Sequence, residues 1–282
     1  MTSKLHKSLL NLLPVFALHS VSRRWVSLLI IVFVVGGCKK SEEAAQSTEP
    51  SADSASGDGF VQIFDGQTLD GWVGDTTYWR AEGGSLIGEV TPTTLLKSNT
   101  FIVWQGGTPG DFELKLEFRI AEAGNSGINY RSEPLPDVPN ALRGYQADID
   151  GKNNYTGQNY EERKRTTLAY RGEKVTVHSQ DNPSDPESLK ANVKNNAWTK
   201  RDVTGSLGNG DSLKTVIKNG DWNTCRIIAK GNHLQHYVND VLMSDVIDDD
   251  TVNRTMSGLL GVQVHVGPPM TVEYRNILLK QL

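Results

Sequence analysis

The segment that decides the fold is Phe112-Glu-Leu-Lys-Leu-Glu-Phe-Arg-Ile120, in which apolar and charged side chains alternate without a break. Successive side chains of an extended chain point to opposite faces, so the apolar residues share one face and the charged residues share the other. A period of two over this length is typical of a β-strand that is buried on one side. The segment therefore predicts a strand packed on a core, not a helix.

The same alternation recurs along the chain from Phe60 onward. The segment Gly261–Val266 sets three valines against Gln263 and His265, and residues 225–229, 234–238 and 272–279 also have strand character. Turn dipeptides such as Asp-Gly and Asn-Gly separate these runs. No window longer than about twelve residues has a strong helical period. These patterns predict an all-β sandwich with about a dozen strands.

Composition and charge narrow the class of protein further. The 282 residues include 29 Lys and Arg against 33 Asp and Glu, which gives a formal net charge of -4. A nucleic-acid-binding surface needs an excess of basic residues, so we expect no nucleic-acid partner. Two cysteines cannot build a disulfide scaffold.

The first 59 residues differ in composition from the remainder. Residues 25–35 form an apolar run interrupted only by Ser27, and Gly36-Gly37-Cys38 follow it. The run has the length of a signal-peptide core, and Val35–Cys38 resembles a bacterial lipobox. We therefore predict a lipoprotein signal peptide at 1–38, lipid attachment at Cys38, a flexible tether at 39–59 and one domain at 60–282. An uncleaved anchor helix is the alternative. We therefore expect the protein in a bacterial cell envelope, on the periplasmic side or the outer surface, bound to the membrane through the lipid.

Residues 178–211 break the strand rhythm. They are rich in Lys and Asn and contain few large apolar residues. We interpret them as a long loop on the sandwich. Such loops often line binding sites, but a surface insertion without a role is an equal alternative.

Four segments place unusual polar groups on the face opposite the expected core. They are Glu113 and Glu117, then Asn129 and Arg131, then Gln146, Asp148 and Asp150, and finally Gln263 and His265. Carboxylates and amides hydrogen-bond sugar hydroxyls, Arg binds oxyanions, and His transfers protons near neutral pH. We therefore predict one polar cleft, with four unrelated solvated edges as the alternative.

A series of short motifs follows in a fixed order along the chain. The motifs are Phe64-Asp-Gly-x-x-Leu-Asp-Gly-Trp72, Trp79-Arg-Ala-Glu-Gly-Gly-Ser-Leu-Ile-Gly88, Asp111-Phe-Glu-Leu-Lys-Leu-Glu-Phe-Arg119, Gly124-Asn-Ser-Gly-Ile128, Gly144-Tyr-Gln-x-x-Ile-Asp150, Asp221-Trp-Asn-Thr-Cys-Arg-Ile227, Val238-Asn239 and Gly261-Val-Gln-Val-His265 with Tyr274-Arg-Asn-Ile277. In this order the motifs resemble those of one family, the 3-keto-disaccharide hydrolases, and the resemblance covers about Phe60 to Leu282. It implies a concanavalin-like jelly-roll sandwich of two antiparallel sheets and a role in envelope sugar catabolism.

The resemblance also implies a carbohydrate substrate and a chemistry for the polar cleft. A 3-keto-glycoside has an acidic hydrogen on C2, so a base can start an elimination that breaks the glycosidic bond, and water then adds to the product. We predict His265 or Asp148 as the base, Glu117 as the acid and Arg131 as the enolate stabiliser. Four amides are predicted to bind hydroxyl groups, namely Asn125, Asn129, Gln146 and Gln263.

No cofactor is required for this cleavage, because an earlier oxidation supplies the ketone. A divalent cation bound by Asp148 and His265 is an alternative electrophile to Arg131. A non-catalytic carbohydrate-binding module is the alternative to the enzyme, because sandwiches of this kind also bind glycans without cleaving them. In that case Trp72, Trp79, Trp104 and Trp222 are the candidates for stacking on sugar rings.

Overall fold

The computed structural model describes residues 58–180, 182, 185, 187 and 200–282. The predicted signal peptide, Cys38 and nearly all of the predicted tether lie outside these residues. Within the described ranges no helix has both the length and the apolar character needed to cross a membrane.

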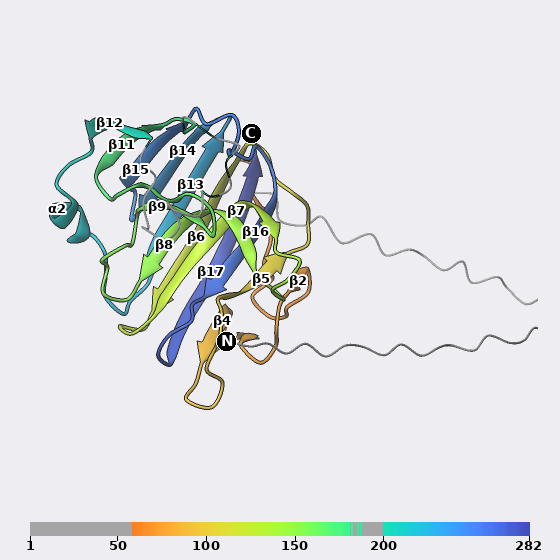
Figure 1. Cartoon of the computed structure of the whole chain (residues 1–282). Helices are drawn as coiled ribbons and strands as arrows, with labels where there is room; N and C mark the ends of the chain where they lie inside the picture. The colour runs from red at the N-terminus through yellow and green to blue at the C-terminus, as the bar shows by residue number, and fades with distance from the viewer. Residues whose placement is uncertain (1–57, 181, 183–184, 186, 188–199) are drawn as a thin grey trace, which may run out of the picture. The chain divides into compact units, whose positions relative to one another are not determined.

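Two sheets form most of the described part of the chain, which also contains the short helix α2 (Gly210–Lys214) (Figure 1). The larger sheet has the order β12 (Arg201–Ser206), β11 (Glu173–Val177), β15 (Val241–Asp248), β14 (His233–Val238), β13 (Asn223–Lys230), β6 (Phe112–Ile120), β17 (Met270–Gln281), β4 (Ser85–Val90) and β3 (Trp79–Glu82), with β1 (Val61–Gln62) pairing to β17. The smaller sheet has the order β10 (Thr166–Ala169), β9 (Asn159–Glu162), β8 (Leu142–Asp150), β7 (Asn125–Pro134), β16 (Leu259–Val264), β5 (Thr100–Trp104) and β2 (Trp72–Val73). This arrangement confirms the predicted all-β jelly-roll sandwich.

Strand β6 shows how the alternating sequence produces this architecture. Its five apolar side chains are buried and its four charged side chains are partly exposed, so each residue follows the predicted face. Burying one such apolar side chain stabilises the fold by roughly 1.5–3 kcal/mol. The buried side chains of β6 belong to one core cluster that also contains residues of β7, β8 and β16 from the smaller sheet. The core therefore lies between the two sheets.

Two details of the topology differ from the prediction. Strand β11 runs parallel to β15, with Val175 paired to Val246, so the larger sheet is not antiparallel throughout. Residues 201–206, predicted as part of a loop, form β12 and pair with β11. The low apolar content of β12 concealed it, because an edge strand with an exposed face needs few buried residues.

Candidate functional site

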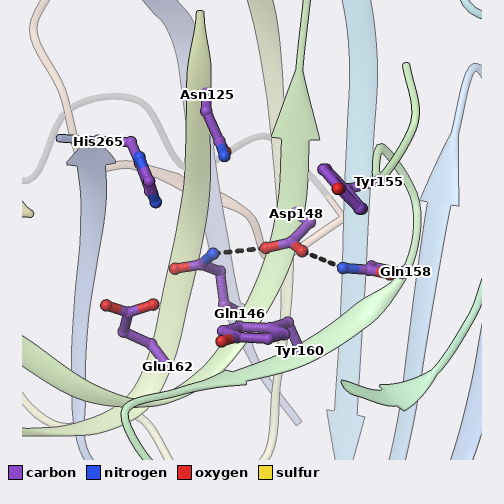
Figure 2. Close-up of a pocket in the computed structure, with 8 residues that line it drawn as sticks. All are labelled: Asn125, Gln146, Asp148, Tyr155, Gln158, Tyr160, Glu162 and His265. Carbon is purple, nitrogen blue, oxygen red and sulfur yellow. Dashed lines mark hydrogen bonds between the residues drawn. The ribbon is translucent and has the colours of Figure 1, made fainter. Parts of the chain in front are cut away.

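Eight side chains line a pocket of about 150 Å³ on the outward face of the smaller sheet (Figure 2). They come from β7 (Asn125), β8 (Gln146, Asp148), the loop after β8 (Tyr155, Gln158), β9 (Tyr160, Glu162) and the residue after β16 (His265). The residues of β8 that alternate with Gln146 and Asp148 belong to the core, so these two side chains must face outward. The pocket therefore collects polar groups from five neighbouring segments on one face of the sheet.

Asp148 lies at the centre of this pocket and is only 8% exposed. Its Oδ1 accepts a hydrogen bond from Gln146 Nε2 at 2.5 Å, and its Oδ2 accepts one from Gln158 Nε2. Burial raises the pKa of Asp148 to about 7; the two amide hydrogen bonds oppose this rise, and the negative charges of Glu162 and Asp150 add to it. A carboxylate with this pKa is a far stronger base than an ordinary aspartate, and it titrates near neutral pH.

The Gln146 side chain reaches Asp148 across Gly127 of β7, which has no side chain to block it. Gly127 pairs with Asp148 across the two strands, and a Cβ atom at position 127 would collide with the Gln146 side chain. Gln263 of β16 donates from Nε2 to Gln146 Oε1 at 3.2 Å. This bond occupies the amide oxygen of Gln146, so its N–H group is the end that faces Asp148.

A second carboxyl group, Glu162, occupies the other side of the pocket beside His265. Asn99 Nδ2 donates to Glu162 Oε1 at 3.0 Å, and Asn99 Oδ1 accepts the Val266 N–H at 2.9 Å. Asn99 therefore ties the segment that carries His265 to Glu162. Burial raises the pKa of Glu162, while the Asn99 hydrogen bond and the nearby charges of Arg163 and His265 lower it in part.

The tautomer of His265 follows from its contact with the main chain. His265 Nδ1 lies 2.6 Å from the Val266 carbonyl oxygen. A carbonyl oxygen can only accept, so Nδ1 carries a hydrogen, and in the neutral ring Nε2 keeps its lone pair. His265 can therefore accept a proton on Nε2 or, once protonated, donate it.

Tyrosine side chains supply the apolar surface of the pocket. Tyr155 is 50% exposed at the rim and follows β8 in a loop clamped by Asp150. Asp150 Oδ1 accepts the Tyr155 and Thr156 N–H groups at 2.7 and 3.0 Å, and Arg171 donates to the Thr156 carbonyl at 2.7 Å. The ring of Tyr155 is therefore presented on a fixed backbone.

Four of the predicted site residues meet in this pocket, namely Asn125, Gln146, Asp148 and His265. Gln263 lies beneath Gln146 and is fully buried. Asn129 is also fully buried and pairs with Gln146 across the strands, so it lies under the pocket floor and does not line the pocket.

Glu117 lies outside the pocket, which corrects its predicted place in the cleft. Strand β6 pairs with β13 and β17 in the larger sheet, so the outward face of β6 belongs to the other sheet. Glu117 Oε2 accepts from Arg275 at 2.7 Å and Oε1 accepts from Asn276 at 2.8 Å. Burial alone would raise the pKa of Glu117, but these hydrogen bonds and the Arg275 charge lower it overall.

Arg131 also lies outside the pocket. The pairing of β7 with β8 shifts between Tyr130 and Glu133, and Arg131 has a φ angle of 45°, so the alternation of faces ends before it. Its guanidinium is buried and donates to the Gly110 and Gly231 carbonyls at 2.9 and 2.7 Å and to Asp111 at 3.0 Å. Arg131 therefore joins three backbone segments and does not face the substrate pocket.

The predicted cation alternative receives no support from the donor geometry. Among the described residues no group of three His, Cys, Asp or Glu side chains lies close enough to hold a metal ion. Both carboxylate oxygens of Asp148 accept hydrogen bonds from amide groups, and His265 directs Nδ1 to a carbonyl group. A divalent cation held by Asp148 and His265 therefore stays a prediction.

Sequence reasoning missed four residues of the pocket, namely Tyr155, Gln158, Tyr160 and Glu162. A signal was present, because Gln158, Tyr160 and Glu162 alternate at a period of two, as Gln146 and Asp148 do. The tryptophans proposed for sugar stacking do not line the pocket. Trp72 and Trp79 are buried in the core, and Arg275 stacks over Trp222 at 3.9 Å.

Comparison with known proteins identifies the family of the domain. Residues 59–280 match the family model of the 3-keto-alpha-glucoside-1,2-lyase-like domain. A comparison with curated proteins finds no significant match. A crystal structure of a candidate glycosyl hydrolase from Parabacteroides distasonis ATCC 8503 is similar at 19% identity, with a TM-score of 0.49, over 80% of this chain and 94% of that one. The carbohydrate-binding module CBM66 from Bacillus subtilis is similar at 16% identity, with a TM-score of 0.45, over 76% and 97%.

Proposed function

The chain belongs to the family of 3-keto-alpha-glucoside-1,2-lyase-like domains, and from this premise we propose that its pocket breaks the glycosidic bond of 3-keto-glycosides by elimination. The observation that carries the proposal is Asp148, a buried carboxylate with a pKa of about 7 that is held by two amide groups. An enzyme that removes a weakly acidic C–H proton at neutral pH needs such a base.

The proposed reaction is an elimination followed by addition of water. The C3 carbonyl group acidifies the hydrogen on C2, and Asp148 takes that proton while the C–H electron pair forms an enolate across C2 and C3. The enolate then restores the C3 carbonyl, forms a double bond between C1 and C2, and expels the oxygen on C1. The leaving oxygen takes a proton, so the products are an alcohol and an unsaturated keto sugar. Addition of water to this sugar gives the free 3-keto sugar.

The opposite side of the pocket supplies the proton for the leaving group. Burial raises the pKa of Glu162, so this carboxyl group keeps a transferable proton closer to neutral pH than an ordinary glutamate does. We assign Glu162 as the acid, in place of Glu117. The Asn125 amide points into the pocket (Figure 2), and we assign it to the enolate oxygen in place of Arg131.

The proposal is tested with a 3-keto-glucoside, the same glucoside without the ketone, and a 3-keto-glucoside deuterated at C2. We expect cleavage only of the keto compounds, a slower reaction of the deuterated one, and an unsaturated product detectable by NMR. Equal cleavage of the ordinary glucoside, or no isotope effect combined with direct formation of the free sugar, would contradict the elimination. Saturable binding of ordinary glycans without any turnover would favour the carbohydrate-binding module.

The place of the reaction and of the protein is also a proposal. The ketone must come from an oxidation of the sugar at C3, so an oxidoreductase acting on glycosides has to precede this enzyme. We propose that the domain at 60–282 works in the bacterial envelope, tethered through residues 39–59 to a lipid on Cys38. Substitution Cys38→Ala is then expected to move the protein from the membrane fraction to the soluble fraction, and unchanged fractionation would contradict the anchor.

A further inference from the structure

A buried histidine on the larger sheet contacts the segment that holds Asp148. His236 of β14 is 1% exposed and points into the core. Its Nε2 lies 2.9 Å from the Tyr130 hydroxyl, and its Nδ1 lies 3.2 Å from the Gln158 carbonyl oxygen. Tyr130 and Gln158 belong to the smaller sheet and the loop that leads into it, so the imidazole bridges the two layers of the sandwich.

The two contacts fix the tautomer of His236. The Gln158 carbonyl oxygen can only accept, so Nδ1 carries the hydrogen and Nε2 accepts from the Tyr130 hydroxyl. Burial lowers the pKa of His236 to about 4, so the ring is neutral at physiological pH and keeps this arrangement. The ring is therefore an oriented donor aimed at one carbonyl group.

That carbonyl belongs to a residue that contacts Asp148 twice. The Gln158 carbonyl oxygen also accepts the Asp148 N–H at 3.4 Å, and the Gln158 side-chain amide donates to the Asp148 carboxylate (Figure 2). A shift of the Gln158 backbone therefore displaces the amide that holds the carboxylate.

The position of β14 does not itself require an imidazole at this residue. The backbone of His236 is paired with Ile227 of β13 and with Ser244 of β15, so the strand is held by its two neighbours. An apolar residue here would leave the buried Tyr130 hydroxyl without this acceptor and the Gln158 carbonyl without this donor. The imidazole therefore serves the Tyr130 hydroxyl and the Gln158 carbonyl group, and the pairing of β14 does not depend on it.

We propose that His236 is a positioning residue that acts through Gln158: by donating to the Gln158 carbonyl, it fixes the amide that orients the Asp148 carboxylate. The inference rests on the proposed function, because Asp148 is the base of that reaction. The other ionisable groups that face Asp148 are Glu162, Asp150, His265, Tyr155 and Tyr160. All of them are retained in the variants compared below.

The first test uses NMR of the protein without substrate. In the unmodified full chain, nitrogen NMR of His236 is expected to show a hydrogen on Nδ1 and none on Nε2; the reverse tautomer would overturn the proposal. Carbon NMR then gives the pKa of Asp148 in wild type and two matched variants. Asparagine places an amide nitrogen near the position of Nδ1, whereas glutamine places one near Nε2.

We expect His236→Asn to leave the pKa of Asp148 unchanged and His236→Gln to raise it, because the Gln158 hydrogen bond lowers that pKa in the wild type. The rise is on the order of one unit, which means about a tenfold lower deprotonated fraction in acid solution. Equal pKa values in all three proteins, or an equal rise in both variants, would overturn the proposal. The substitution Gln158→Met provides the second route, because it removes the same donor without changing the core.

Activity measurements on the same variants distinguish a failure of this inference from a failure of the proposed function. In His236→Gln the acidic limb of kcat/KM is expected to move to higher pH with little change in KM, and adding Gln158→Met is expected to cause no further shift. Additive shifts in the double variant would overturn the inference alone. A wild-type protein that cleaves no 3-keto-glycoside, but shows the expected tautomer and pKa values, would overturn the proposed function and leave the positioning role intact.

Discussion

The larger and the smaller sheet both carry carboxylates on their outward faces, in strands whose apolar and polar residues alternate. The carboxylates of the two faces have different hydrogen-bond partners. On the larger sheet, Glu117 is paired with Arg275 and its pKa is lowered. On the smaller sheet, Asp148 is held by Gln146 and Gln158, and its pKa is raised to about 7. An arginine neutralises a carboxylate, whereas an amide holds it without supplying charge.

The difference shows that the partner, more than the carboxylate, decides between a structural and a chemical role. Arg226 binds Glu113 at 2.6 Å and Arg119 binds Glu273 on the larger sheet, so that face is a ladder of ion pairs. The pocket contains no arginine among its lining residues and concentrates amides around its acids. Amide partners keep an acid oriented and leave it available for proton transfer.

The largest expected effect tests this contrast through activity. Asp148→Asn removes the base and is expected to lower kcat/KM on a 3-keto-glucoside by about 10²–10⁴-fold. The matched control is Glu117→Gln, which changes a carboxylate to an amide on the other face and is expected to leave kcat/KM unchanged. A comparable loss in both variants would show that the two faces do not differ in function.

The second effect is on stability and follows from the raised pKa of Asp148. Its pKa is about 7 in the folded protein against 3.8 for an ordinary aspartate, so between these values the folded state holds a proton that the unfolded state releases. The free energy of unfolding therefore falls as pH rises from about 4 to about 7, by up to about 4 kcal/mol from this group. Urea unfolding at pH 5 and pH 8 is expected to show this fall in wild type.

The variant Asp148→Asn isolates that contribution. Glu162, whose pKa is also raised, titrates in both proteins, so the difference between them reports on Asp148. We expect a smaller loss of stability between pH 5 and pH 8 in the variant than in wild type. An identical loss would mean that Asp148 titrates as an ordinary aspartate.

A third effect concerns binding at the rim. The substitution Tyr155→Ala removes the exposed aromatic face beside the pocket and is expected to raise KM about 3–10-fold, with kcat nearly unchanged, because stacking contributes about 0.5–1.5 kcal/mol. Tyr155→Phe should keep the wild-type KM. The control is Tyr170→Ala, a similarly exposed tyrosine that contacts Arg201 and does not line the pocket. A change confined to kcat would assign Tyr155 a role other than binding.

The smallest expected effect is on the larger sheet. Arg275→Met removes the charged partner of Glu117, so the pKa of Glu117 is expected to rise toward its ordinary value. Both side chains are partly exposed, at 38% and 27%, so the loss of stability should be less than about 1 kcal/mol. Chemical denaturation measures the stability, and kcat/KM should stay at the wild-type value. A large loss of activity would reveal coupling between the two faces.

The sequence predicted the layers of the fold well because alternation is a local property. Each residue of β6 has the burial that its position in the pattern implies. The pairing of strands is not local, and this explains the error at Glu117. Its strand and β8 have similar patterns, but the pattern does not say which sheet a strand joins, and the two outward faces lie on opposite sides of the core.

The candidate site was predictable only in part for two further reasons. The Asp148 and Gln146 positions followed from alternation in β8, but Arg131 did not follow, because a register shift in β7 changes the face after Tyr130. His236 has no sequence signal of its own: an alternating strand places it in the core, and only the structure shows that its ring reaches Gln158.

The glycine at position 127 has a consequence for engineering and for natural variation. The Gln146 side chain fills the space that a Cβ atom at position 127 would take. A single added methyl group would therefore displace this side chain and weaken its hydrogen bond to the Asp148 carboxylate. The proton affinity of the pocket could thus be retuned by editing a residue that has no ionisable group and no side chain at all.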